Sequence, residues 1–193
     1  MRFLKNFYLQ KKSDQELMSL VKLNDDQDAF ALIYDRHSAA VYSFVRNMVK
    51  NDSVSEEIAH EAFLKLYNNR DKYETGRKLV SWLWSIARNL CIDWMRKRKE
   101  YAVGDESSIE EMAIDNSEGV LNELIEKSNL NILKASIEKL KTSQKEVLLL
   151  WLEEMSLEEI STIVSKSPQA VKNLIHRAKK ELIMEINNNT EGL

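Results

Sequence analysis

The sequence predicts an all-α protein made of two small helical domains, and three observations support this. The 193 residues include only four glycines and one proline, too few for the many turns of an all-β fold. Apolar residues recur at helical spacing along most of the chain, without strand-like alternation of any length. Residues 102–119 are acidic and contain no Lys or Arg. We therefore expect one domain over residues 1–100, a flexible linker over 101–128 and a second domain over 129–193.

The composition fits a globular protein and excludes several other classes. Hydrophobic residues make up 44% of the chain and charged residues 31%. The single cysteine, Cys91, excludes an internal disulfide framework, and its apolar helical setting predicts core packing in a reducing cytoplasm. We expect no signal peptide and no membrane span, because no apolar run approaches the roughly 20 residues that a span needs. With a formal net charge of -3, any DNA-binding surface must segregate its positive charge.

The first domain is predicted to consist of helices with one long polar loop. Ser13 and Glu16 form a capping-box pattern, which opens a helix carrying Leu17, Met18 and Val21. Further helices are expected over residues 30–49, 56–67 and 79–99, with a break at 51–53 and a polar loop at 68–78.

The helix predicted over residues 79–99 has two different faces. At about 100° per residue, one face is apolar and is expected to enter the core: Val80, Leu83, Trp84, Ala87, Leu90, Cys91 and Trp94. Trp82 lies roughly opposite, in a stripe with Asn89 and Arg96, and the basic run Arg96-Lys97-Arg98-Lys99 ends the helix. A tryptophan, an amide and cations suit DNA with unstacked bases. Alternatively, Trp82 packs on a neighbouring helix and the basic run is a solvated helix end.

The second domain shows the pattern of a helix-turn-helix. After periodic apolar residues between Leu121 and Leu140, Ser143-x-x-Glu146 and Ser156-x-x-Glu159 each predict the start of a helix. A tight turn over 164–166 leads to Ser167-Pro168, where serine is a good N-cap and proline suits the first helical position. Two helices joined by so short a turn make a helix-turn-helix.

The helix from Pro168 is amphipathic, and its polar face has the composition of a DNA-recognition helix. Cations suit phosphates and guanine edges, and amides suit adenine. Alternatively, this is an ordinary solvated face, since Lys and Arg are common on surfaces. The residues on the polar face are Gln169, Lys172, Asn173, His176 and Lys180, flanked by Arg177 and Lys179.

Three segments resemble a known family. SEEIAHEAFLKLY (55–67), SWLWSIARNLCIDWMRKRK (81–99) and EVLLLWLEEMSLEEISTIVSKSPQAVKNLIHRAKKEL (146–182) are similar to regions 2.2, 2.3–2.4 and 4 of bacterial RNA polymerase sigma factors. The two-domain size resembles the extracytoplasmic-function (ECF) class. The sequence departs from the family pattern at a few positions: His60 replaces a usual Gln, Lys141 a frequent Pro, and Met155 and Ser165 a common Gly.

The resemblance implies a non-catalytic, cytoplasmic subunit without a cofactor, whose partners are core polymerase (the β and β′ subunits), promoter DNA and an anti-sigma protein. The acidic linker resembles the segment that threads toward the polymerase active-site channel. The resemblance implies that Glu57, Ile58, Glu61 and Phe63 dock on β′, and that the 68–78 loop captures a flipped −10 base in a pocket lined by Tyr73 and Asn89. The helix face described above adds Trp82, Arg96, Lys97 and Arg98 to the −10 set. The resemblance also implies that Lys172, Asn173, His176 and Arg177 contact the −35 element, and the polar face adds Gln169 and Lys180 to this set.

Two other functions compete with this interpretation. A stand-alone helix-turn-helix regulator explains residues 143–182, but neither the Trp82 stripe nor the predicted docking helix. A metal-dependent enzyme is suggested only by the Glu56, Glu57, His60 and Glu61 cluster, which has no second histidine nearby. The sequence therefore favours a promoter-recognition subunit.

Overall fold

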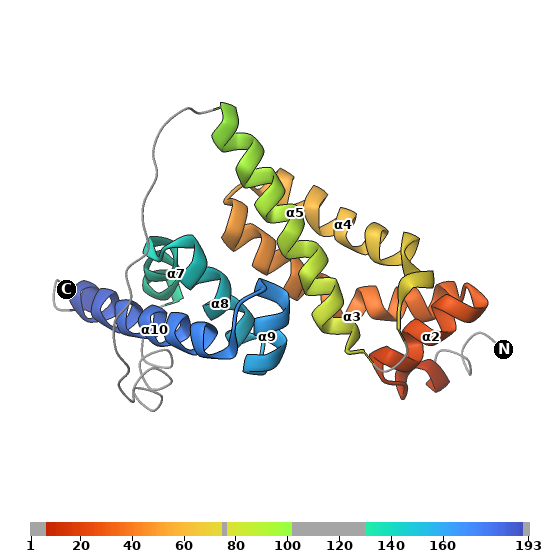
Figure 1. Ribbon diagram of the computed structural model, residues 1–193. Coiled ribbons are helices and arrows are strands. Elements are labelled where there is room, and N and C mark those ends of the chain that lie inside the picture. Colours follow the sequence, from red (N-terminus) through yellow and green to blue (C-terminus); the bar gives the residue numbers. More distant parts are fainter. Residues whose placement is uncertain (1–6, 75–76, 102–129, 191–193) are drawn as a thin grey trace. The chain divides into compact units, whose positions relative to one another are not determined.

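The computed structural model describes residues 7–74, 77–101 and 130–190. Over these ranges the chain is helical and contains no strand (Figure 1). It divides into two compact units, Met1–Val103 and Gly104–Leu193. The linker predicted over 101–128 lies outside the described residues except for Tyr101, the last residue of a helix, and so does the periodicity expected between Leu121 and Ile125.

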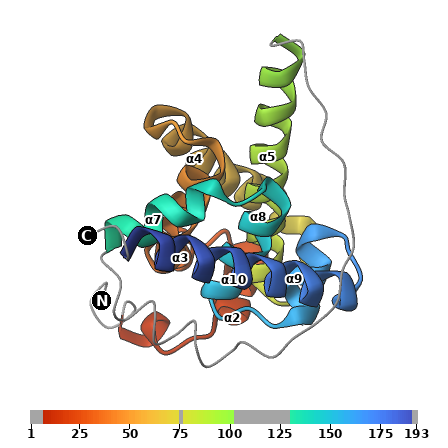
Figure 2. The same cartoon turned by 90° about the vertical axis from the view of Figure 1, so that its left-hand side faces the viewer.

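Unit 1 is built around a central helix, α3, which packs against three other helices. Its core holds Trp84, whose ring meets Phe44 edge-on with centroids 5.1 Å apart, and Cys91 is buried as predicted. Figures 1 and 2 show the last turns of α5 extending beyond the other helices of this unit. The elements of unit 1 are α2 (Asp14–Asn24), α3 (Gln27–Val49), α4 (Asp52–Asn68), the 3-10 helix η1 (Arg70–Lys72) and α5 (Leu79–Tyr101).

Capping side chains define where the helices of unit 1 begin. The capping box at α2 is confirmed: the Glu16 N–H donates to Ser13 Oγ (3.3 Å), and the Ser13 N–H donates to Glu16 Oε2 (2.8 Å). The predicted start of the next helix at Glu56 is wrong, because α4 begins at Asp52. Asn51 Oδ1 accepts from the Val54 N–H at 3.0 Å, so the polar residues that suggested a break instead form an N-cap and first turn.

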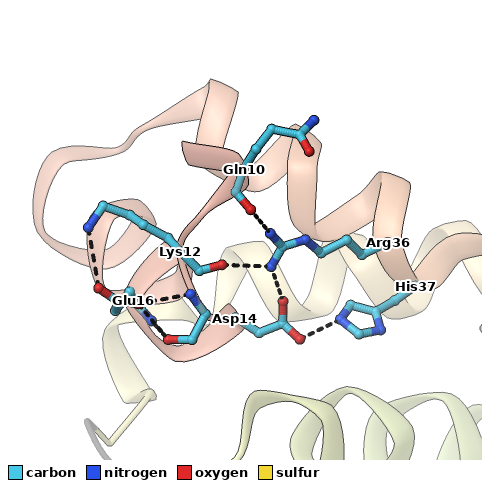
Figure 3. Close-up of polar contacts among 7 residues, drawn as sticks. Gln10, Lys12, Asp14, Glu16, Arg36 and His37 are labelled. Carbon is cyan, nitrogen blue, oxygen red and sulfur yellow. Dashed lines mark hydrogen bonds and ion pairs between the residues drawn. The ribbon is translucent and has the colours of Figure 1, made fainter. Parts of the chain in front are cut away.

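A polar cluster holds the start of α2 against α3 (Figure 3). Arg36 Nη1 donates to the Lys12 carbonyl (2.9 Å) and to Asp14 Oδ1 (2.7 Å), while Nη2 donates to the Gln10 carbonyl (2.9 Å). The other Asp14 oxygen lies 2.8 Å from His37 Nε2. The hydrogen bond to His37 lowers the pKa of the Asp14 carboxyl, and burial opposes this only partly. One carboxylate therefore links α2 to two side chains of α3.

Unit 2 has one long helix, along which three shorter helices lie (Figure 2). Its elements are α7 (Leu130–Lys139), α8 (Thr142–Leu152), α9 (Leu157–Val164) and α10 (Pro168–Thr190). A buried apolar cluster joins α7, α8 and α10: Ile137, Leu140, Leu148, Ala178, Leu182 and Ile186. Among the described residues of both units, no helix combines the length and apolar character that a membrane crossing requires.

The helix boundaries of unit 2 confirm most of the predicted caps. The Ser156–Glu159 capping box is present, and the Ala170 N–H donates to Ser167 Oγ at 3.2 Å at the start of α10. The predicted cap at Ser143 is wrong, because α8 begins at Thr142 after Lys141, whose N–H donates to Gln144 Oε1 (3.2 Å).

The turn between α9 and α10 has a left-handed residue where the sequence lacks glycine. Ser165 ends α9 with φ 55° and ψ 44°. Glycine adopts this conformation without steric cost, whereas serine adopts it less readily. The departure from the common Gly therefore leaves the turn in place, and it makes Ser165 a point of local backbone strain.

Candidate nucleic-acid interfaces

The outer surface of α5 carries the first candidate interface. Asn89, Arg96, Lys97 and Arg98 are exposed, and Trp82 is half-buried. The predicted apolar face packs inward, with Val80 and Trp94 only half-buried. The stripe therefore combines an aromatic ring near one end of α5 with cations near the other.

The cations of this surface make only weak local contacts. Arg96 Nη2 lies 3.1 Å from Asp93 Oδ1, and both side chains are largely exposed. The Arg98 guanidinium lies over the Trp94 ring, 5.4 Å from its centroid. An exposed ion pair contributes at most about 1 kcal/mol to stability, and a cation–π contact at an exposed site contributes about 0.5–1 kcal/mol. Both arginines can therefore exchange these contacts for phosphate groups.

Tyr73 lies differently from what its predicted role suggested. It is only 2% exposed, and its ring stacks on Trp82 with centroids 5.8 Å apart and an interplanar angle of 19°. Its hydroxyl donates to the Arg77 carbonyl (2.6 Å), and its own carbonyl accepts from Lys22 Nζ (2.6 Å). Burial raises the pKa of the Tyr73 hydroxyl, and the nearby Asp14 carboxylate adds to the effect. The predicted polar loop thus contains η1 and a firmly packed tyrosine.

The second candidate interface is the polar face of α10. Gln169, Lys172 and Lys180 are exposed, while Asn173 and His176 are half-buried. The side-chain amide of Gln169 donates to Asn173 Oδ1 at 3.1 Å. Arg177 is half-buried on the same helix. The opposite, apolar face is buried at Val171, Ile175, Ala178 and Leu182, as the periodicity predicts, whereas Leu174 of the same predicted face is only half-buried.

Lys179 belongs to the core of unit 2 rather than to this polar face. It is only 3% exposed, and its Nζ lies over the Trp151 ring, 3.7 Å from the centroid. A desolvated cation–π contact contributes about 2 kcal/mol. The sequence placed Lys179 at the flank of the polar face, and no local signal pairs it with a tryptophan of another helix.

The surface of α4 contains only part of the predicted docking set. Glu57 and Glu61 are exposed, whereas Ile58 and Phe63 are buried in the core of unit 1. The stripe that contains Ile58 and Phe63 therefore packs α4 into the core, and these two side chains do not lie on the surface of the unit. Leu64, which the sequence pattern did not single out, is 60% exposed.

Glu56, Glu57 and Glu61 are exposed on α4 around His60, which is also exposed. Among the described residues, no group of three or more His, Cys, Asp or Glu side chains is arranged to hold a metal ion. The two ring nitrogens of His60 have local partners: Nδ1 lies 2.9 Å from the Glu56 carbonyl, and Nε2 lies 3.2 Å from the Tyr34 hydroxyl.

Comparison with known proteins identifies the family. Residues 33–101 match the family model for Sigma-70 region 2, and residues 130–182 match that for Sigma-70, region 4. SigW of Bacillus subtilis, an ECF RNA polymerase sigma factor, is 34% identical over 165 residues, which cover 81% of this chain and 88% of SigW. The chain belongs to the family of ECF RNA polymerase sigma factors. CarQ of Myxococcus xanthus, also an RNA polymerase sigma factor, is 30% identical over 161 residues, covering 81% of this chain and 88% of CarQ.

Solved structures of sigma factors share the fold of this one. CnrH, in complex with the cytosolic domain of CnrY, has a TM-score of 0.68 at 20% identity, covering 92% of this chain and 99% of CnrH. The sigma factor RpoE, in complex with the anti-sigma factor NepR from Bartonella quintana, has a TM-score of 0.65 at 22% identity, covering 82% and 96%. These likenesses confirm the all-α fold.

Family membership settles the general function. This sigma factor binds RNA polymerase and directs initiation at specific promoters. The stand-alone regulator is not favoured, because the region 2 match accounts for the part of the chain that such a regulator leaves unexplained. Both candidate DNA interfaces lie within the matched spans, whereas α2 precedes the span matched to region 2.

Proposed function

We propose that this sigma factor reads a promoter with two separate surfaces, the outer stripe of α5 at the −10 element and the polar face of α10 at the −35 element. The supporting observation is the placement of Trp82, Asn89 and Arg96 along one helix, in a chain whose other unit presents an exposed helix-turn-helix face. Trp82 offers a stacking surface worth about 1–3 kcal/mol per base. Arg96, with the adjacent cations, holds the backbone.

The α10 surface provides the sequence-reading contacts of a recognition helix. Its amides, Gln169 and Asn173, suit adenine edges, while Lys172, Arg177 and Lys180 suit guanine edges or phosphates. His176 lies half-buried between them and supplies a further polar contact. The strained turn at Ser165 sets the angle at which α10 follows α9.

The two surfaces depend on the polymerase to act together. The chain carries a formal net charge of -3, so it lacks the bulk positive charge that drives non-specific DNA binding. Docking on core polymerase fixes the distance between the units, so the second DNA contact forms at a high effective concentration. The −35 contact positions the complex, and unit 1 then traps extruded −10 bases, which converts binding energy into strand opening. The chain itself performs no covalent chemistry.

Docking on the β′ subunit is assigned to the exposed residues of α4. Glu57 and Glu61 supply negative charge, and Leu64 supplies an apolar contact among them. Lys65 pairs with Glu61 at 3.1 Å, an exposed contact that a partner can displace at little cost. Ile58 and Phe63 contribute indirectly, because their packing in the core of unit 1 fixes the position of α4.

We also propose that a protein antagonist controls this sigma factor in the cytoplasm, where the polymerase works. RpoE is bound to an anti-sigma factor, and CnrH is bound to the cytosolic domain of CnrY. An antagonist of the same kind would act by covering the surfaces that meet the polymerase. Co-purification with a partner that blocks binding to core polymerase supports this, and full activity in the presence of every co-purified protein contradicts it.

A transcription experiment with purified core polymerase tests the proposed function. Run-off transcripts from genomic fragments are compared with and without the chain, and the selected promoters are then used in all further experiments. We expect promoter-specific transcripts only when the chain is added. Tight, sequence-specific binding of the chain to DNA without polymerase, and no effect on transcription by core, would instead support the stand-alone regulator.

A further inference from the structure

The contacts of Tyr73 suggest a role for helix α2, which precedes the span matched to region 2. We propose that Lys22 and Tyr73 are positioning residues for the −10 surface: Lys22 fixes Tyr73, and the Tyr73 ring supports Trp82 from behind as a platform for one base. This inference rests on the proposed role of α5. It differs from the role implied by resemblance, in which Tyr73 itself lines the base pocket.

Lys22 extends from a helix that is anchored at its other end. The Asp14 carboxylate joins the first turn of α2 to Arg36 and His37 of α3 (Figure 3). Between Asp14 and Lys22, the apolar face of α2 is buried through Leu17, Met18 and Val21. The lysine therefore starts from a fixed backbone, and less conformational entropy is lost when its Nζ binds a distant acceptor.

That acceptor is the backbone of the segment between η1 and α5. Lys22 Nζ donates to the Tyr73 carbonyl at 2.6 Å, across 51 residues of sequence. A charged donor makes this hydrogen bond stronger than one between neutral groups. Because the contact is partly buried, water replaces it poorly. Lys22 thus holds the backbone at the residue that directly follows η1.

Tyr73 transmits this constraint to the tryptophan. Its carbonyl is held by Lys22, its hydroxyl by the Arg77 carbonyl, and its ring by the near-parallel contact with Trp82. With 2% of its surface exposed, Tyr73 cannot meet a base while it keeps these contacts. Trp82 stays partly exposed although Tyr73 covers one face of its ring. The geometry therefore supports a preorganised tryptophan rather than a pocket lined by tyrosine.

The test compares promoter opening with closed-complex formation, using the full chain reconstituted with core polymerase. Opening is measured by permanganate reactivity of −10 thymines at saturating polymerase, and closed-complex affinity is measured at low temperature. Lys22→Met removes the donor, Lys22→Arg keeps a cation, and Lys11→Met serves as a matched control because Lys11 is exposed and lies over the Phe7 ring. Thermal unfolding of each variant shows whether it is folded.

We expect Lys22→Met to lower the open fraction about tenfold, with closed-complex affinity unchanged within about twofold. Lys22→Arg should recover most of the opening, and Lys11→Met should match the natural chain. Should Lys22→Met fold poorly, Tyr73→Phe and Tyr73→Leu make the same test: phenylalanine keeps the ring on Trp82 and should open promoters far better than leucine.

Several outcomes would overturn the inference. These are normal opening by Lys22→Met, equal losses of closed-complex affinity and opening, or a Lys22→Arg variant as defective as Lys22→Met. Trp82→Ala separates this inference from the proposed function. If Trp82→Ala opens promoters normally, the proposed −10 role of α5 fails together with the inference. If Trp82→Ala is defective and Lys22→Met is normal, only the positioning role fails.

Discussion

The two proposed DNA surfaces differ in how they are built. The α10 surface lies on one helix whose start is fixed by its own cap, Ser167, and whose contacts among polar side chains are local, such as Gln169 with Asn173. The α5 surface depends on segments far apart in sequence, because Trp82 is packed against Tyr73, and Tyr73 is held by Lys22. Substitutions on α10 should therefore affect only the DNA contacts of the substituted residue. Substitutions in unit 1 outside α5, such as at Lys22, should affect DNA contacts indirectly through Tyr73 and Trp82.

The largest effect is expected from Trp82→Ala. Loss of the stacking surface should reduce promoter opening by about tenfold or more, since stacking contributes about 1–3 kcal/mol per base. Asn89→Ala should act on the same step more weakly. Permanganate reactivity at saturating holoenzyme measures the open fraction, and gel-shift titration at low temperature measures closed complexes. If these substitutions weaken closed complexes as much as opening, the assignment of α5 to unstacked bases is wrong.

On α10, Lys172→Ala and Arg177→Ala should lower promoter affinity before any strand opens. Each lost base contact costs about 1–3 kcal/mol, and each lost phosphate contact reduces the salt slope by about 1. The affinity of reconstituted holoenzyme is measured over a salt series, on promoters with an intact or a scrambled −35 element. A defect that persists unchanged on the scrambled promoter would contradict a −35 role.

Two adjacent lysines sharpen the contrast between surface and core. Lys179→Met should cost about 1–2 kcal/mol of stability, because it removes the cation over the Trp151 ring. Lys180→Met, at an exposed position, should change stability by less than about 0.5 kcal/mol and should lower DNA affinity instead. Urea unfolding and promoter titration of both variants make the comparison. Equal losses of stability and of DNA affinity in the two variants would contradict the assignment of Lys179 to the core and Lys180 to the DNA surface.

The smallest effect concerns the Asp14 cluster and its dependence on pH. The hydrogen bond to His37 lowers the pKa of Asp14 in the folded chain, so its contribution to stability is complete above the ordinary carboxyl pKa. That contribution is lost as the pH falls through the lowered pKa. Asp14→Asn should therefore destabilise unit 1 at neutral pH and progressively less in acid. Hydrogen exchange of α2 in both chains over a pH series checks this, and a difference that stays constant with pH contradicts it.

Much of the fold follows from local sequence patterns, because the signals act within one or two helical turns. Ser13 with Glu16, Ser156 with Glu159, and Ser167 before Pro168 all mark helix starts that the structure has. The apolar periodicity likewise identified the buried faces of α5 and α10. Boundaries were missed where a cap is made by a less obvious residue. Asn51 opens α4 earlier than predicted, and Gln144 binds the backbone at the start of α8.

The candidate site was less predictable, because its geometry depends on tertiary contacts. Tyr73 lies in a stretch predicted as a polar loop, but it is buried, with Trp82 against its ring and Lys22 bound to its carbonyl. Lysine is usually a surface residue, but the cation–π contact with the Trp151 ring makes a buried position favourable for Lys179. The family resemblance places Ile58 and Phe63 on the docking surface, but both are buried, as their apolar helical spacing also predicts. No local pattern specifies these partners.

The open fraction of promoter already bound by holoenzyme distinguishes the two proposed surfaces. We propose that α10 positions the complex and that α5 opens the strands, on a polymerase that holds both units. At saturating polymerase, we expect Arg177→Ala to leave the open fraction close to that of the natural chain and Trp82→Ala to reduce it by about tenfold or more. Equal reductions by both substitutions would contradict a division of labour between the two surfaces.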